Sequence, residues 1–158
     1  MKEKEFNVDV EYGKLKDQFN LPNFKDLNSE FELSDISEGE FLLRSIRRRL
    51  CEKIDEFSNI IEGFIFPQSA SLANFYEVKF LSDDEREKLS NLFKRLMVLN
   101  RRNLMFDLAP NEKEEAEFIT ATYGEWLTIK KELLGLVSIM EKSWTEEDKI
   151  PTDKGYFG

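Results

Sequence analysis

Five arginines have the chemistry to receive an anionic group. They are Arg44, Arg47, Arg48, Arg101 and Arg102. The first three lie in one segment with helical periodicity and the last two lie in the next, so helices would have to bring them together. A guanidinium presents a planar fork of donors that suits phosphate or carboxylate, which predicts a surface for an anionic partner. The alternative is that these arginines pair with nearby carboxylates, as Arg48 can with Glu52 one helical turn further on.

Two carboxylates have a spacing that could serve a metal ion. Glu52 and Asp55 are three residues apart in a helical segment, so both side chains would share one helix face. Carboxylate oxygens are the ligands that Mg²⁺ prefers, and such a site needs no histidine. This pair therefore raises the hypothesis of a Mg²⁺-dependent, all-α hydrolase. The alternative is that both carboxylates face solvent or the arginines, and no other cofactor is expected.

The sequence offers no conventional set of catalytic residues. It contains no histidine, which excludes Ser-His-Asp and Cys-His systems as well as HExxH zinc sites. Cys51 is the only cysteine, so it can form no disulfide within the chain, and it lacks an activating base. We therefore predict no catalytic residue and favour a protein that is not an enzyme.

An aromatic stripe near the C-terminal end is a candidate interface. Trp126 and Trp144 are eighteen residues apart, about five helical turns, so they can lie on one stripe with Tyr123 and Met140. An apolar surplus of this kind is typical of a subunit interface. The alternative is that the same side chains fill the core of a monomer.

Charge is distributed unevenly along the chain. The 23 basic and 32 acidic residues give a net charge of −9, which argues against nonspecific binding of nucleic acid along the whole surface. Residues 1–40 carry 5 basic and 11 acidic residues, 41–110 carry 12 and 10, and 111–158 carry 6 and 11. The mildly basic middle, which holds the arginines, leaves a local contact with phosphate possible.

Three long segments have the periodicity of amphipathic helices, at about 38–66, 83–108 and 112–143. Ser82 and Glu85 form a capping-box pattern before the second segment, and Asn111 is the expected N-cap of the third. Alternation of apolar and polar residues predicts short strands at 5–12 and 75–81, and Phe31 with Leu33 could form a third.

These elements predict a mainly α fold, an antiparallel bundle of three long helices with a small β element from the N-terminus and the inter-helix segment, and α+β as the alternative class. Its 158 residues suit one domain. We expect residues 1–37 to form a strand and an irregular arm packed on the bundle, 38–144 the bundle itself, and 145–158 a polar tail.

The most consistent interpretation is a non-catalytic interaction or assembly protein, acting as a subunit or homo-oligomer through its amphipathic helices. The alternatives are an accessory subunit of a nucleic-acid machine, with a local phosphate contact, and the Mg²⁺-dependent hydrolase. The N-terminal residues show neither a signal-peptide pattern nor a membrane-spanning run, so we expect a cytoplasmic protein without membrane contact. Dense Glu and Lys with only two Gln also suggest a thermophile's composition.

Overall fold

The computed structural model describes residues 6–66 and 71–146, and all the regular structure within these ranges is helical. Its helices are α1 (Val8–Phe19), α2 (Phe24–Phe31), α3 (Leu42–Ile65), α4 (Leu72–Val78), α5 (Asp83–Leu108) and α6 (Glu112–Thr145), with a 3-10 turn at Leu33–Asp35. The polar tail expected at 145–158 lies, apart from its first two residues, outside these ranges.

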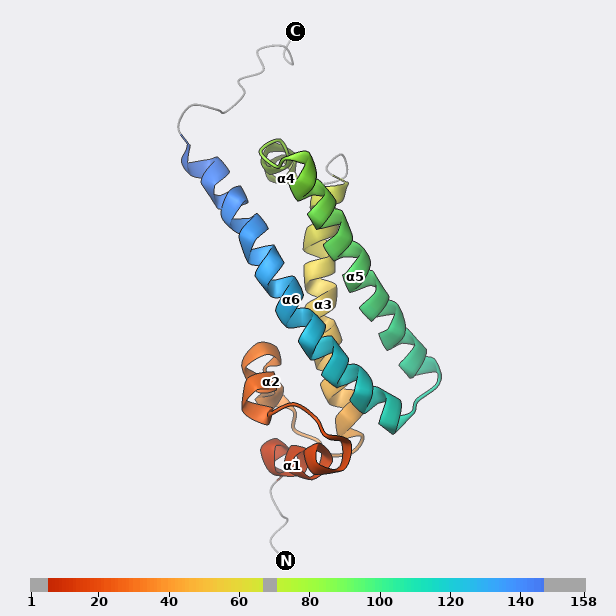
Figure 1. Ribbon diagram of the computed structural model, residues 1–158. Helices are drawn as coiled ribbons and strands as arrows, with labels where there is room; N and C mark the ends of the chain where they lie inside the picture. The colour runs from red at the N-terminus through yellow and green to blue at the C-terminus, as the bar shows by residue number, and fades with distance from the viewer. Residues whose placement is uncertain (1–5, 67–70, 147–158) are drawn as a thin grey trace, which may run out of the picture.

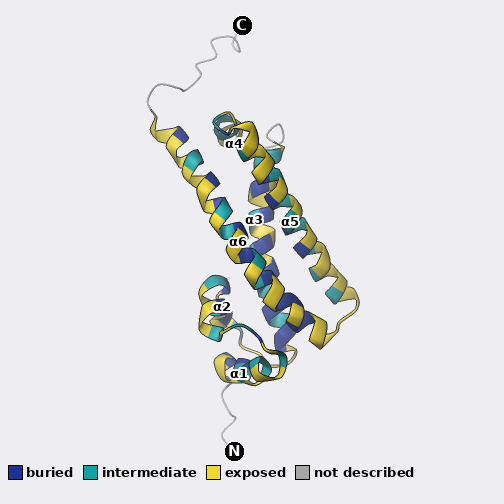
Figure 2. Ribbon diagram, in the orientation of Figure 1, coloured by how far each residue is buried: buried dark blue, intermediate teal, exposed yellow. Residues whose placement is uncertain are grey.

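The long helices α3, α5 and α6 pack together, as predicted for the bundle (Figure 1). Their buried positions recur every three or four residues and line the sides that face one another (Figure 2). The innermost side chains include Ile46, Leu50 and Ile54 of α3, Leu92 and Leu96 of α5, and Ile119 and Ile129 of α6. Burial of this apolar stripe holds the three helices in one core.

The starts of α5 and α6 confirm the capping signals in the sequence. The Ser82 hydroxyl accepts from the Glu85 N–H while the Glu85 carboxylate accepts from the Ser82 N–H, which completes the capping box. The Asn111 side chain accepts from the Glu114 N–H. In contrast, α3 begins four residues later than the pattern suggested, because Phe41 adopts a left-handed conformation with φ 56°.

The predicted N-terminal strand is wrong, because the segment forms helix α1. Asn7 caps it by accepting from the N–H groups of Asp9 and Val10. Val8 and Tyr12, two of the alternating apolar residues, are four apart and are both buried on one helix face, whereas Val10 between them is exposed. A separation of four residues fits both the two-residue period of a strand and the 3.6-residue period of a helix. The short alternation therefore could not distinguish a strand from a helix.

The other two predicted strands are wrong for related reasons. Within 75–81, Tyr76 and Phe80 stack with ring centroids 5.0 Å apart, as residues one helical turn apart can. Phe31 ends α2, and Glu32 takes a left-handed conformation before Leu33 turns back into the core. The fold is thus all-α over the described residues, without the predicted β element.

The N-terminal helices pack against the bundle through polar anchors as well as apolar contacts. The Glu30 carboxylate of α2 accepts from Trp126 Nε1 at 2.9 Å and from Lys130 Nζ at 2.6 Å. The backbone carbonyl of Glu30 also accepts from Lys53 Nζ on α3. Residues 6–37 therefore form a helical cap on one end of the bundle rather than an irregular arm (Figure 1).

Candidate functional site

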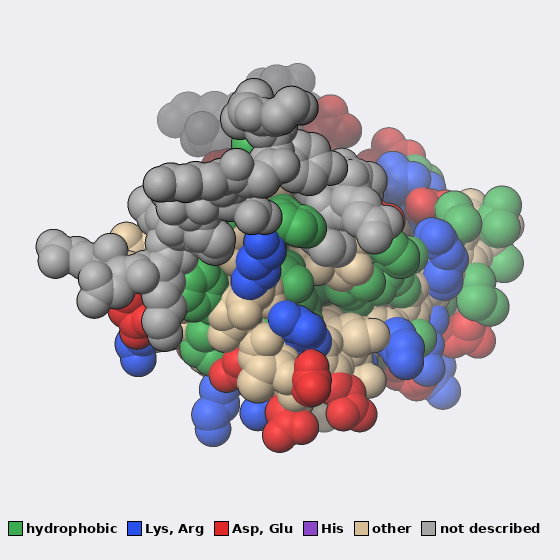
Figure 3. All heavy atoms as spheres, turned by 90° about the horizontal axis from the view of Figure 1, so that it is seen from above, with side chains coloured by type: hydrophobic (Ala, Val, Ile, Leu, Met, Phe, Trp, Pro, Cys, Tyr) green, Lys and Arg blue, Asp and Glu red, His purple; other side chains and the backbone are tan. Residues whose placement is uncertain are grey.

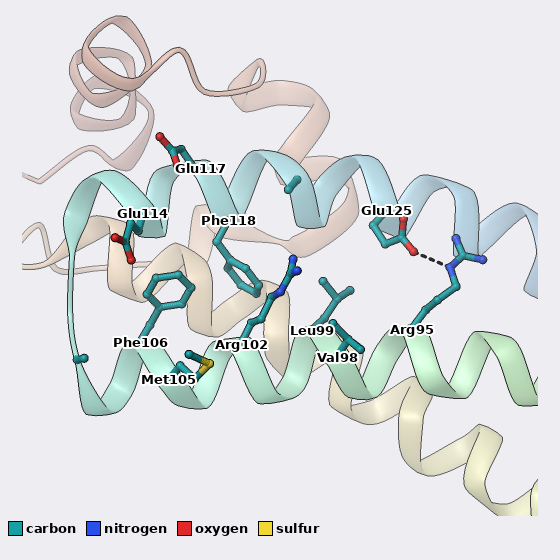
Figure 4. Close-up of a pocket in the computed structure, with 12 residues that line it drawn as sticks. Arg95, Val98, Leu99, Arg102, Met105, Phe106, Glu114, Glu117, Phe118 and Glu125 are labelled. Carbon is teal, nitrogen blue, oxygen red and sulfur yellow. Dashed lines mark hydrogen bonds and ion pairs between the residues drawn. The ribbon is translucent and has the colours of Figure 1, made fainter.

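A hollow lies between α5 and α6, at the end where the two helices are joined. It has a volume of about 670 Å³ and is lined mainly by apolar side chains (Figure 4). Leu99 and Phe106 of α5 and Phe118 of α6 form its apolar lining, and the rings of Phe106 and Phe118 lie 5.3 Å apart. We call this hollow the α5/α6 groove.

Several large apolar side chains of α5 project toward solvent in and beside the groove. Val98 is 52% exposed, Met105 66% and Leu108 80%. They fall outside the buried stripe of α5, which faces α3 and the inner side of α6. In Figure 3, hydrophobic side chains stand at the right-hand edge of the bundle with basic and acidic side chains beside them, on the side on which α5 lies in Figure 1. Such a cluster is more typical of a contact surface than of a solvated helix face.

The two walls of the groove carry opposite charge. On α5, Arg95 donates to Glu125 at 2.5 Å and to Glu132 at 2.8 Å, and Arg102 extends across the groove toward Phe118 (Figure 4). Arg102 forms no ion pair within the described residues, and neither do Glu114 and Glu117, which line the α6 side. The groove therefore presents unpaired positive charge on one wall and unpaired negative charge on the other.

Behind the groove, one guanidinium joins all three long helices. Arg47 of α3 is fully buried and donates to Glu115 of α6 at 3.1 Å and to Asp107 of α5 at 2.7 Å. It also donates to the side chain and the backbone carbonyl of Asn103. Glu115 is itself only 3% exposed, so the two groups neutralise each other in the interior.

The structure separates the five arginines predicted to receive an anionic partner. Arg47 is committed to the interior and offers no donor at the surface. Arg48 shares Asp107 with it, at 3.3 Å, and Arg44 lies over the ring of Phe41. Arg101 and Arg102 are exposed and without an ion pair in the described parts of the chain. Only this last pair remains unengaged, and of the two Arg102 lines the α5/α6 groove.

The predicted aromatic interface divides between core and surface. Trp126 is 2% exposed and Met140 is also buried, so both belong to the core of the monomer. Tyr123 is partly buried. Trp144 is half exposed, stacks on Tyr76 with centroids 4.5 Å apart, and donates to Glu77 of α4 at 2.6 Å. The four residues therefore do not form one continuous surface.

The remaining candidates are the carboxylate pair Glu52 and Asp55 and the thiol of Cys51. Glu52 and Asp55 are exposed, Glu52 pairs with Arg49 at 3.3 Å, and no group of three or more potential metal ligands occurs within residues 6–66 and 71–146. Cys51 is buried, and burial raises the pKa of its thiol to about 12. At neutral pH the thiol is therefore protonated and weakly nucleophilic.

The sequence interpretation did not select the apolar residues of the groove. Val98 and Met105 are seven residues apart on α5 and form a second, short apolar stripe beside the buried one. That spacing is a usable signal for a contact surface. In a long helix with many apolar residues, two neighbouring apolar stripes merge in the sequence pattern into one broad apolar face.

No protein-family model, curated protein or solved structure matches the chain. Within the described residues, no helix combines the length and apolarity needed to cross a membrane.

Proposed function

We propose that this protein is a non-catalytic interaction or assembly protein that binds another protein surface through the α5/α6 groove. The observation that carries the proposal is the apolar groove itself, flanked by Val98 and Met105, which are large side chains more than half exposed. Their burial on binding would contribute roughly 25 cal/mol for each Å² removed from water. The unpaired charges on the two walls would set the orientation of the partner.

The mixed charge of the groove favours a protein partner over nucleic acid. A phosphate backbone approaching Arg102 would also meet Glu114 and Glu117 on the opposite wall. The phosphates and these carboxylates both carry negative charge and repel each other, so an evenly anionic polymer fits the groove poorly. A protein surface can place an acidic group on one side and a basic group on the other.

Site-specific photo-crosslinking of the full chain tests this proposal. A photoreactive residue at Val98 should give a discrete adduct in cells that express the protein, and mass spectrometry identifies the protein attached. The adduct should be lost in a Met105→Glu background, because a charge placed on the apolar wall disfavours burial. The same photoreactive residue at Glu56, an exposed position of α3, is the control. Absence of an adduct at Val98, or an equal one at Glu56, would overturn the proposal.

A further inference from the structure

We infer that the occupant of the α5/α6 groove is a second copy of this chain, related to the first by a two-fold axis parallel to α5 and α6. This inference rests on the proposed function, since it names the partner of the same surface. Two-fold dimers use one patch on both copies, so the patch must be complementary to itself. The charge, the side-chain sizes and the geometry of the groove each meet that requirement.

The register of α5 against α6 determines which residues would meet. The two helices are antiparallel, and Phe106 stacks on Phe118 while Arg95 pairs with Glu125. Arg101 and Arg102 therefore lie at the level of α6 between Phe118 and Glu125. Rotation about an axis parallel to the helices keeps these levels and places α5 of each copy on α6 of the other.

Charge complementarity selects this axis. It brings Arg102 of one copy to the outer face of α6 in the other, at the level between Phe118 and Glu125. Of the α6 carboxylates without an ion pair among the described residues, Glu117 lies next to this level and Glu114 about one turn beyond it. A two-fold axis perpendicular to the helices would instead place α5 on α5 and set arginine against arginine. Only the parallel axis pairs the basic wall with the acidic one, and it does so twice in each dimer.

The sizes of the side chains also suit this arrangement. The outer face of α5 projects Val98, three residues from Arg95, whereas α6 near that level carries Gly124, next to Glu125, and Ala121 about one turn further on. A Cβ atom built on Gly124 would have no neighbouring atom within 4 Å, so this part of α6 leaves open space. Large side chains from one helix can therefore pack closely on the small residues of the other.

Charge-reversal variants of the α5 wall and the α6 wall test whether the occupant is a second copy. The full chain should have twice its mass of 18.7 kDa in native mass spectrometry and in sedimentation at micromolar concentration. The variants Arg101→Glu/Arg102→Glu and Glu114→Arg/Glu117→Arg should each be monomeric, because each places like charges together. An equimolar mixture of the two should form a heterodimer, since each reversed wall then meets its complement. Asp55→Lys/Glu56→Lys, a reversal on exposed positions of α3, should leave the dimer unchanged.

The possible results distinguish this inference from the proposed function. A wild-type chain that stays monomeric at low salt, or a mixture that gives no heterodimer, would overturn the second copy as the occupant. Pairing of the arginine-reversed variant with wild type would point to the perpendicular axis and overturn the arrangement. If the second copy fails while the Val98 crosslink still yields a different protein, the proposed function stands. If neither a dimer nor a Val98 crosslink is found, both this inference and the proposed function are overturned.

Discussion

The inner and outer sides of the α5/α6 pair use the same kinds of residue with opposite results. On the inner side, Arg47 from α3 meets Glu115 and Asp107, and each nitrogen of its buried guanidinium donates a hydrogen bond. On the outer side, Arg102 and Glu117 line the groove without ion pairs among the described residues. The inner charges join helices of one chain, whereas the outer charges remain available to another molecule.

This difference shows that environment, rather than residue type, decides what an arginine does. A guanidinium removed from water is strongly destabilising unless carboxylates and carbonyls replace its hydration. The same group at the surface costs nothing to leave unpaired and contributes little to stability when paired. Stability should therefore respond to changes on the inner side, and association to changes on the outer side.

The largest expected effect follows removal of the inner guanidinium. Arg47→Ala leaves the Glu115 carboxylate buried without its partner and should lower the free energy of unfolding by about 3–5 kcal/mol. Arg95→Ala is the matched change, because Arg95 also pairs with two carboxylates but lies partly exposed. It should cost about 1 kcal/mol or less. Urea denaturation followed by circular dichroism measures both. Equal losses would contradict the contrast between the two sides.

A smaller contrast is expected between two small residues of α6. Ala116 is buried, so Ala116→Leu should overpack the core and cost about 1–3 kcal/mol. Gly124 has open space around it, so Gly124→Ala should stabilise the helix by about 1 kcal/mol. Thermal unfolding at one low protein concentration compares the two variants. Destabilisation by both would show that the outer face of α6 is as closely packed as the inner one.

The smallest expected effect is on the pH dependence of the fold's stability when Asp107 is replaced. The hydrogen bond from Arg47 holds the pKa of this carboxyl below its usual range, against the opposing effect of burial. The carboxylate therefore stabilises the fold above its unfolded pKa of about 3.9, and this contribution disappears as pH falls through the lower folded pKa. Asp107→Asn should accordingly be less stable than wild type at neutral pH, by up to about 1 kcal/mol, with no difference in strong acid.

Melting curves at a series of pH values measure this effect. Asp55→Asn serves as the control, because Asp55 is exposed and forms no ion pair in the described ranges. A difference between Asp107→Asn and wild type that stays constant from neutral to acidic pH would contradict the prediction.

The long helices could be predicted from sequence because their signals are local. The apolar period of α5 and α6 continues over several turns, and Ser82 and Asn111 cap them through atoms only a few residues away. The segments of α1 and α4 differ from the prediction because each is short, and apolar residues four apart fit both the strand and the helix period. In α1, burial of Val8 and Tyr12 against the bundle, rather than the alternation around them, determined the outcome.

The candidate site could be predicted only in part. Grouping the arginines identified Arg102, which lines the groove, but also Arg47, which is buried. Adjacent positions in a helix differ by 100°, so Arg47 and Arg48 in one run point to different surroundings. Arg47 pairs with the carboxylates of Glu115 and Asp107, which are sixty or more residues away in the sequence.

The sequence by itself determined the three long helices, the capping of α5 and α6, and the absence of a histidine-based active site. These follow from residue types and from interactions within one or two helical turns. Only the tertiary structure decided which arginine is buried, which tryptophan belongs to the core, and where α5 and α6 leave a groove. Each of those depends on how three helices face one another, and helix rotation and register come from contacts between residues far apart in the chain.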